Sequence, residues 1–354
     1  VSGNHVGAYH AVASAAADEI ASALDRAQKV AGPCVQDTGI ERGCLDAFVR
    51  TFGRRAWRRP LEDAEVTRVA TNASVGGTGP EVVGRAVFDL LMAPDFAYHV
   101  EVRGREANRV LRLSPYEIAA RLSYHFWQTL PDDELLAAAA SGELDTDDGY
   151  RKAVARVFAD PRTHATINLF YRQWLHLDAF SGFGAGQPFV AFATAGGRPT
   201  PDGALHRAMV EEIDALTERF TWRTGARVAD LLTTTDNVTT HAGLASLYGT
   251  TAWDGTGTPP SFPTDQRAGL LTRAAFLVSG DEKTSPFHRG VVIRRDVLCD
   301  PLAPPDPATL PPDALAPPPV DPTLTTRQRF TRKTDSPGCM ACHRLFNDIG
   351  YVLE

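Results

Sequence analysis

The segment best suited to chemistry lies near the C-terminal end, where two cysteines separated by two residues are followed directly by a histidine: Cys339-Met340-Ala341-Cys342-His343. Two thiols at this spacing can form thioether bonds to the two vinyl groups on one edge of haem, and the next histidine then lies beneath the iron as its proximal ligand. The motif therefore predicts one covalently bound haem c, held by Cys339, Cys342 and His343.

Three other interpretations of this cysteine pair stay open. A thioredoxin-type redox pair has the same spacing, but it normally follows a strand in an α/β fold, and strand patterns are scarce in this chain. A zinc site needs a second close pair of ligands, for which Cys299 is a poor substitute. A structural disulfide would close a small, strained ring.

The sixth iron position decides between electron transfer and ligand chemistry, and His288 is the first candidate for it. The competing interpretation of His288 is an ordinary histidine on a surface loop between two helices. His125 lies on the apolar side of its expected helix, where a core histidine is more common than a ligand. Met340 lies inside the attachment loop, and Met92 and Met209 are typical core fillers.

The leading function is an electron-transfer protein with one haem and a separate redox partner protein or partner domain. The second hypothesis is a haem-dependent oxidoreductase of peroxidase or oxygenase type, in which the sixth position is open and the helical domains shape a substrate pocket. A third is a structural subunit in which haem acts only as a staple. The chain has no nucleophile elbow, Gly-rich phosphate loop or zinc-protease helix, which disfavours hydrolytic activity.

Composition indicates a globular protein, and its cysteines favour an exported one. Of the 354 residues, 43% are apolar and 22% charged, which excludes a fibrous or wholly disordered chain. The net charge of −7 comes without a long basic run, so nucleic acid is not expected as a partner, and no apolar stretch is long enough to span a bilayer. Cys34 and Cys44 flank a turn-forming loop and are expected to be joined, which suits an oxidising compartment. We expect a periplasmic or extracellular location with the signal peptide removed.

Helical periodicity predicts a mainly α fold. The clearest start is Ser114-Pro115-Tyr116-Glu117, which combines a capping serine, a proline in the first turn and a glutamate that closes a capping box. The expected helices cover residues 10–30, two parts of 45–70 broken at Pro60, 81–92, 114–130, a restart after 131–133, 150–158, 164–175, 206–220, 267–278 and 289–298, and one short helix is expected within 325–354. The helix over 206–220 carries Met209, Ile213, Leu216 and Phe220 on one apolar stripe.

Two kinds of charged cluster accompany these helices. Arginines gather around Trp57 at positions 54, 55, 58 and 59, and we interpret them as a solvated, salt-bridged helix end rather than an anion or haem-propionate site. Acidic residues gather at 132–134 and 145–148, where the helix dipole explains them without catalysis.

Loop-rich stretches divide the chain into three expected domains: residues 1–105, 106–262 and 263–354. Residues 181–203 and 251–266 are rich in loop-forming residues, and the second stretch marks the last boundary. Ten prolines fall between Pro301 and Pro322, which favours polyproline II geometry and a stiff strap along a surface. The residues after the strap are too few to bury a porphyrin, so we expect the preceding part of the last domain to cover it. The apolar residues expected there are Phe276, Leu277, Phe287, Val291, Val292, Ile293 and Leu298.

Several motifs, taken in order, resemble one known set of proteins. They are Phe52 to Leu61 (FGRRAWRRPL), Ala93 to Phe96 (APDF), Leu113 to Glu117 (LSPYE), Leu122 to Tyr124 (LSY), Leu130 to Asp133 (LPDD), Arg267 to Leu271 (RAGLL), Thr284 to Pro286 (TSP), Arg289-Gly290, the Pro-rich run, the cysteine motif, Ile349-Gly350 and Leu353-Glu354. This order resembles the large secreted proteins first noted in planctomycetes, built from helical domains of unknown function followed by a cytochrome c-like module.

The resemblance covers nearly the whole chain from about Cys34. It implies multi-domain helical bundles with a C-terminal cytochrome c-like module and the Pro-rich strap, and it supplies no substrate. Asn347-Asp348 stands where the family pattern usually has Asp-Pro, a departure that does not affect haem attachment. The family usually continues into a further helical domain, so we expect this chain to be a mature fragment or processed subunit that another chain would complete.

Overall fold

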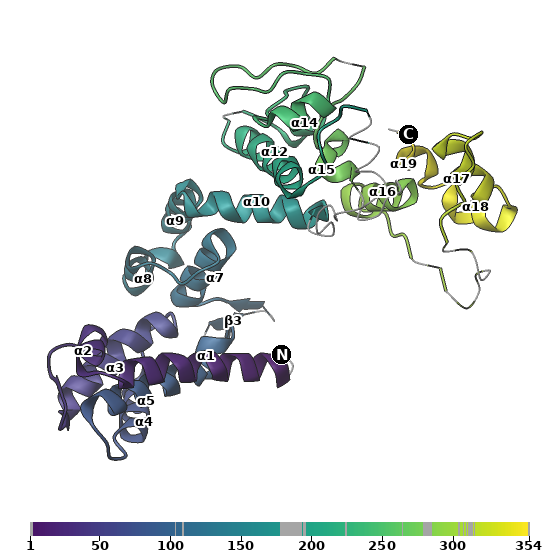
Figure 1. Cartoon of the computed structure of the whole chain (residues 1–354). Helices are drawn as coiled ribbons and strands as arrows, with labels where there is room; N and C mark the ends of the chain where they lie inside the picture. Colours follow the sequence, from purple (N-terminus) through teal and green to yellow (C-terminus); the bar gives the residue numbers. More distant parts are fainter. Residues whose placement is uncertain are drawn as a thin grey trace. The chain divides into compact units, whose positions relative to one another are not determined.

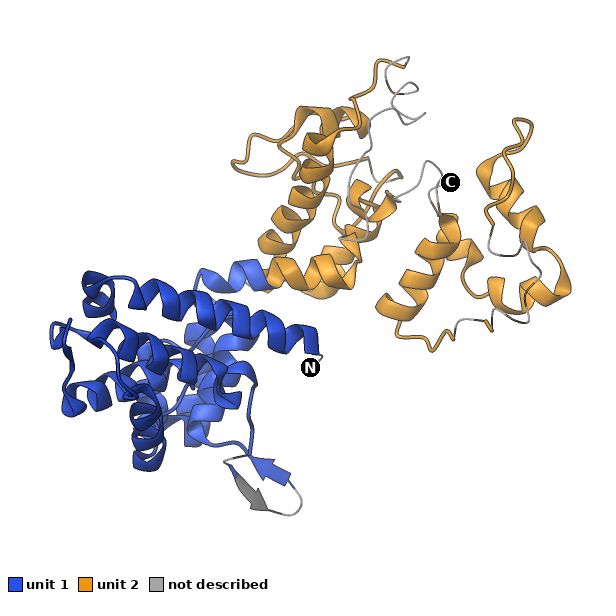
Figure 2. Ribbon diagram, turned by 60° about the horizontal axis from the view of Figure 1, so that its bottom comes forward, with its two compact units in different colours: residues 1–166 blue, residues 167–354 orange. Residues whose placement is uncertain are grey.

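The computed structural model describes residues 3–102, 104–107, 110–177, 193, 196–223, 225–263, 265–278, 285–303 and 316–352, together with positions 305, 306, 308, 310 and 314. For 105–107 it describes only the backbone. The chain divides into two compact units, residues 1–166 and 167–354, which are coloured separately in Figure 2. No helix among the described residues is both long and apolar enough to cross a membrane.

The first part of unit 1 is a helical bundle around one hydrophobic core. Its elements are α1 (Gly3–Ala21), α2 (Leu24–Ala31), β1 (Val35–Gln36), β2 (Gly39–Ile40), α3 (Arg42–Ala56), α4 (Asp63–Ala73), α5 (Gly79–Met92) and α6 (Pro94–Ala97). Helices α1 and α5 pack closely because Gly84 leaves no side chain between them: a Cβ there would lie 2.7 Å from the Ala17 carbonyl oxygen. The core centres on Val49, Val69, Val83 and Leu90, all essentially buried.

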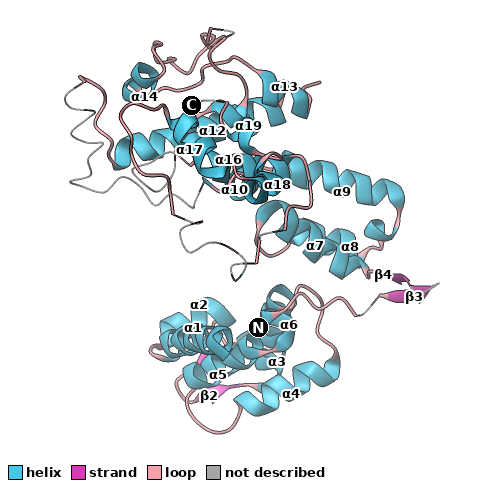
Figure 3. Ribbon diagram, turned by 90° about the vertical axis from the view of Figure 1, so that its right-hand side faces the viewer, coloured by secondary structure: helices cyan, strands magenta, loops and turns pink. Residues whose placement is uncertain are grey.

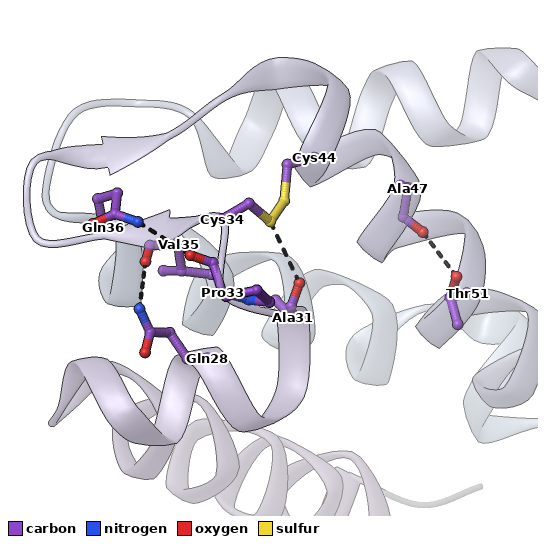
Figure 4. Close-up of a disulfide and its surroundings, with 9 residues drawn as sticks. All are labelled: Gln28, Ala31, Pro33, Cys34, Val35, Gln36, Cys44, Ala47 and Thr51. Atoms are coloured by element: carbon purple, nitrogen blue, oxygen red, sulfur yellow. Dashed lines mark hydrogen bonds between the residues drawn. A yellow bond between two sulfur atoms is a disulfide. The ribbon is translucent and has the colours of Figure 1, made fainter.

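A disulfide joins Cys34 to Cys44 at the edge of this bundle, the pair expected from the loop between them. The intervening residues turn back as the antiparallel β1–β2 hairpin, with Val35 opposite Ile40. Figure 4 shows how Gln28 of α2 donates to the Val35 carbonyl and holds the hairpin against the helix. The crosslink therefore ties the start of α3 to the end of α2.

The second part of unit 1 has its own core. It contains β3 (Arg105–Ala107) paired with β4 (Val110–Arg112), then α7 (Pro115–Trp127), α8 (Asp133–Ala140), the short 3₁₀ helix η1 (Glu143–Asp145), α9 (Asp147–Ala159) and α10 (Arg162–Trp174), which continues into unit 2. Ser114 caps α7 in a complete capping box with Glu117, as predicted. Leu122, Leu135, Leu144 and Val157 fill the core between the helices.

The larger part of unit 2 packs around α12 (Gly203–Thr221). Its other elements are α13 (Val228–Thr233), α14 (Ala242–Leu247), η3 (Leu270–Thr272) and α15 (Ala274–Leu277). The predicted stripe of Met209, Ile213, Leu216 and Phe220 is buried. Residues 251–263 and 265–266 contain no helix, as expected, while most of the predicted 181–203 loop lies outside the described residues.

A buried polar network lies beside this core. Arg273 donates to a Glu212 carboxylate oxygen at 3.1 Å, and Tyr248 donates its hydroxyl proton to the other at 2.6 Å. Arg273 and Glu212 are 0% and 2% exposed, and desolvation of Glu212 raises the pKa of its carboxyl group. Two further donors of Arg273 bind the carbonyls of Gly269 and Asp236, so the buried guanidinium is well satisfied.

The C-terminal part of unit 2 consists of α16 (Pro286–Val292), the π-helical turn η4 (Ile293–Val297), α17 (Thr326–Thr334), α18 (Pro337–His343) and α19 (Asn347–Gly350). In Figure 1, α16, α17, α18 and α19 form the yellow-green end of the chain. The predicted single helix over 267–278 is wrong: the chain forms two short turns, η3 and α15, separated at Arg273. The final segment contains three short helices rather than the single one expected, because the cysteine motif is itself helical.

The chain is mainly α, as predicted. The ladders within the described part of the chain are the hairpins β1–β2 and β3–β4, and the other pairing there is one isolated bridge between Asp236 and Ser261. Figure 3 shows the labelled strands as short magenta elements beside many cyan helices.

Candidate functional site

The cysteine motif occupies α18, a two-turn helix with a well-defined start. Ser336 caps it by accepting a hydrogen bond from the Cys339 backbone N–H, and Pro337 takes the first helical position, where its missing N–H costs nothing. Because residues three apart are neighbours on a helix surface, Cys339 and Cys342 project from the same side of α18. Both are free thiols, Cys339 partly exposed and Cys342 exposed. The helix therefore presents two free thiols on one side.

His343 is the last residue of α18, and two aromatic rings contact it. The Phe287 ring lies 4.4 Å away, centroid to centroid, in an edge arrangement, and the Phe346 ring lies 4.9 Å away. Phe287 also contacts Phe330 of α17 and Tyr351. The histidine thus lies against an aromatic cluster built from α16, α17 and the segment around α19.

One ring nitrogen of His343 is engaged. Nδ1 lies 3.0 Å from Oδ1 of Asn347, four residues further along the chain. A histidine bound in this way at Nδ1 keeps Nε2 as the nitrogen available to a metal. This is the usual arrangement of a histidine that ligates through Nε2.

Glycines allow α16 and α19 to cross closely enough to bring Phe287 to His343. A Cβ on Gly290 would lie 2.2 Å from the Phe346 carbonyl oxygen, and one on Gly350 would lie 2.0 Å from the Pro286 carbonyl oxygen. The buried Arg289 donates to the Gly350 carbonyl at 3.2 Å and closes the crossing. These contacts give a structural reason for the Arg-Gly and Ile-Gly motifs at 289–290 and 349–350.

The residues at this site fit a covalent haem. Cys339 and Cys342 are free and adjacent, the next residue is a histidine with Nε2 available, and aromatic rings supply an apolar flank. Sequence reasoning proposed the three motif residues but missed Asn347, which lies within hydrogen-bond distance of His343. The four-residue spacing from the histidine was a signal that could have identified it.

His288 lies on α16, so the expectation of a loop position is wrong: the helix begins at Pro286, which suits a first helical turn. His288 is exposed, and the charged groups that act on it are His176, Arg295 and Asp296. His343 instead contacts the preceding residue, Phe287. The sixth-ligand role of His288 stays a prediction.

The apolar residues expected to cover the haem divide between two places. Phe276, Val292 and their neighbours Leu277 and Ile293 pack into the core around α12, far along the chain from the motif. Phe287 is the member of the expected set whose ring contacts His343. The apolar flank of His343 therefore comes from Phe287 of α16 and from Phe346, and Phe330 and Tyr351 pack against Phe287 in turn.

The arginine cluster of unit 1 differs from the solvated helix end expected. Arg58 and Arg59 are only 5% and 8% exposed. Arg58 donates to the carbonyls of Phe96 and Tyr98, while Arg59 bridges Glu65 and Asp95. Burial opposes the charge on Arg59, but its two carboxylate partners outweigh burial and raise its pKa. The favoured surface interpretation is wrong for these two residues, which line a cavity of about 170 Å³ with His99 and Glu101.

Other candidates have structural roles. Asp132 caps α8 and pairs with Arg156, as expected of the acidic clusters. His125 is exposed, so its expected place on an apolar face is wrong. Met209 is a buried core residue, as expected.

The motif follows helix α17 rather than a strand, unlike a thioredoxin-type pair. Among the residues that the structure describes, no group of three or more His, Cys, Asp or Glu side chains is arranged to hold a metal ion. The two thiols are not joined to each other.

Comparison with known families gives three matches in order along the chain. Residues 44–101 match PSD5, a protein of unknown function (DUF1595), residues 113–250 match PSD4, a protein of unknown function (DUF1592), and residues 267–354 match PSCyt3, a protein of unknown function (DUF1588). No curated protein and no solved structure matches the chain. With two helical domains of unknown function followed by a cytochrome c-like one, the chain belongs to the planctomycete-type modular proteins with a C-terminal cytochrome c-like module.

Proposed function

We propose that this chain is an exported c-type cytochrome that transfers electrons through one covalent haem c. Cys339 and Cys342 are the attachment residues and His343 is the proximal ligand. The observation that carries the proposal is the combination on α18 of two free thiols on one side of the helix with a histidine whose Nδ1 is already bound.

The roles of the protein residues follow from this arrangement. Cys339 and Cys342 would each hold the haem through one thioether, formed by addition of the S–H bond across a vinyl group, so attachment would require both cysteines reduced and no external oxidant. Bound haem would supply a one-electron Fe(III)/Fe(II) couple. His343 would bind the iron as the proximal ligand, and Asn347 holds the histidine ring in place. Phe287 and Phe346 cover one side of the imidazole and exclude water there.

The attachment is tested by expressing the chain with a c-type cytochrome maturation system in a bacterial periplasm. We expect haem to stay with the protein after denaturation and extraction with acidified organic solvent. Cys339→Ser and Cys342→Ser should each leave one vinyl group intact, which shifts the pyridine haemochrome band to longer wavelength. Cys299→Ser is the matched control and should load as the parent does, because Cys299 lies outside the motif. Full extraction of haem from the parent protein contradicts the proposal.

Electron transfer is tested by voltammetry and by ligand binding. A reversible one-electron wave, with a six-coordinate low-spin iron that does not bind carbon monoxide, is the expected result. A high-spin iron that binds carbon monoxide would favour a haem-dependent oxidoreductase, and a haem without a reversible wave would favour a structural subunit. The proposed partner is a redox protein or a further domain of the same architecture.

His288 is proposed as the sixth ligand. It lies next to Phe287 on the helix that contacts His343, in the segment matched by the cytochrome-like model. Replacement of His288 by Ala should convert the iron to high spin while the haem stays covalently attached. An unchanged low-spin spectrum in the variant rules out this ligand and leaves the attachment site intact.

A further inference from the structure

Asn347 is buried beside His343, with an exposed fraction of 6%. It begins α19, so its side chain lies where the chain turns back after the motif. Its Oδ1 lies 3.0 Å from His343 Nδ1. A buried amide needs partners for both its oxygen and its nitrogen, so the second partner decides which way the group faces.

That second partner is Thr334, at the end of α17. Asn347 Nδ2 donates to Thr334 Oγ1 at 3.1 Å, and Thr334 is 3% exposed. The Thr334 hydroxyl donates in turn to the Phe330 carbonyl at 3.1 Å. Because that hydroxyl proton is used, Oγ1 accepts from Asn347, which places the amide NH₂ on the threonine side. Oδ1 must then face the histidine and accept its proton.

The three hydrogen bonds thus form a series. His343 Nδ1–H donates to Asn347, Asn347 donates to Thr334, and Thr334 donates to the backbone of α17. We propose that Asn347 is a positioning residue that holds His343 as the Nδ1–H tautomer with Nε2 directed to the iron, and that its neutral amide sets the reduction potential. The iron part of this inference rests on the proposed function. The tautomer part concerns the haem-free chain as well.

The sign of the potential effect follows from acceptor strength. A carboxylate accepts the Nδ1 proton more strongly than an amide, which makes the imidazole more electron-donating and stabilises Fe(III). A side chain with no acceptor has the opposite effect. Asn347→Asp should therefore lower the midpoint potential of the haem-loaded full chain, and Asn347→Leu should raise it. A residue with a merely structural role would not move the potential in opposite directions.

Three variants control for added charge and for folding. Arg344→Gln lowers the net charge by one on an exposed residue next to the motif, so its potential shift should be smaller than that of Asn347→Asp. Thr334→Val removes the hydroxyl that orients the amide and should shift the potential in the direction of Asn347→Leu. Thr334→Ser keeps the hydroxyl and should match the parent.

The tautomer is read in the parent chain without any substitution. With ¹⁵N-labelled histidine, the haem-free full chain should show His343 in the Nδ1–H form, with slow exchange of that proton. The haem-loaded chain should show the same slowly exchanging proton. A His343 ring in the Nε2–H form in the haem-free chain overturns the inference, whether or not the chain can carry haem.

The midpoint potentials of the haem-loaded variants give a second test of the positioning role. If the parent loads covalent haem normally but Asn347→Asp and Asn347→Leu leave the midpoint potential unchanged, or shift it in the same direction, the positioning role is wrong and the cytochrome proposal stands. If the haem-free chain shows the Nδ1–H form but no covalent haem is acquired, the proposed function fails and the role of Asn347 in setting a potential fails with it.

Discussion

The Phe287 ring lies 4.4 Å from the His343 ring, although the whole Pro-rich stretch separates the two residues along the chain. The contact joins α16 to α18 and completes an aromatic cluster with Phe330, Phe346 and Tyr351. Phe287→Ala should therefore loosen the C-terminal helices. We expect the free energy of unfolding of this part of the chain to fall by about 2 kcal/mol. This is less than the ~3–5 kcal/mol typical of a fully buried phenylalanine, because Phe287 is only half-buried.

Hydrogen exchange of the full chain, followed by mass spectrometry, checks this effect in peptides from α16 and α18. Leu345→Ala removes an exposed apolar side chain close to the motif and should leave the protection unchanged. Equal loss of protection in both variants would mean that the contact with His343 contributes nothing specific.

The close crossing of α16 and α19 should not tolerate added side chains. Gly290→Ala and Gly350→Ala each place a Cβ about 2 Å from a backbone oxygen, so backbone has to move at a cost of about 1–3 kcal/mol or more. Gly338→Ala is the matched control, because a Cβ there meets nothing within 4 Å. Hydrogen exchange in peptides covering 286–292 and 347–352 should quicken in the first two variants only. Unchanged exchange would contradict the observed crossing.

The Cys34–Cys44 disulfide should stabilise unit 1 by restricting its unfolded chain. For a loop of this length the chain-entropy model gives about 2–3 kcal/mol. The free energy of unfolding of a Cys34→Ser/Cys44→Ser variant should therefore be lower by that amount, and the variant should unfold at a lower denaturant concentration. Cys299→Ser removes an exposed, unpaired thiol and should change the free energy of unfolding by less than about 0.5 kcal/mol. Mass spectrometry of unreduced peptides gives a direct check, and free thiols at both positions would refute the bridge.

Breaking the buried Glu212–Arg273 pair should lower the free energy of unfolding much more than replacing both residues together. Arg273→Met leaves the Glu212 carboxyl buried without its cation, which should lower the free energy of unfolding by about 3–5 kcal/mol. A Glu212→Met/Arg273→Met variant removes both charges and should lose much less. Urea unfolding monitored by tryptophan fluorescence gives both values. Additive losses in the double variant would argue against a coupled pair.

Acid should weaken unit 2 through Asp296, whose carboxylate pairs with Arg295 and with His176 at 2.8 Å. The pKa of Asp296 is lowered from its ordinary value of 3.8 to about 2, and the hydrogen bond from Arg295 makes the largest contribution. A carboxyl whose pKa is lower in the folded chain stabilises it above the ordinary value, and this stability is lost as pH falls from about 5 through about 2. We expect about 1 kcal/mol, because both partners are partly exposed and screened.

Unfolding free energies measured between pH 5 and pH 2 test this dependence. Asp296→Asn should remove it, and 1 M salt should reduce it in the parent because the pair is near the surface. An identical acid dependence in the parent and in Asp296→Asn would show that other carboxyl groups are responsible.

Local sequence signals were enough to predict most helices and to suggest haem attachment at the cysteine motif. Ser114, Pro115 and Glu117 specify a helix start through contacts within one turn, and α7 begins there. The stripe at 209, 213, 216 and 220 likewise predicts the buried face of α12. The haem-attachment hypothesis rests on five consecutive residues, so it needed no knowledge of distant contacts.

Predictions that depended on contacts between distant segments succeeded less often. Arg58 and Arg59 look like a solvated helix end in sequence, because nothing local reveals that α6 and the residues after it supply carbonyls and a carboxylate to bury them. His288 and Phe287 are adjacent in sequence, yet Phe287 contacts His343 while His288 lies exposed among charged residues. Neighbouring residues on a helix point about 100° apart, so only the packing of α16 against α19 selects the one that reaches the motif. Attachment chemistry depends on residue spacing along one short helix, whereas the surroundings of His343 depend on long-range packing between helices, which no local pattern encodes.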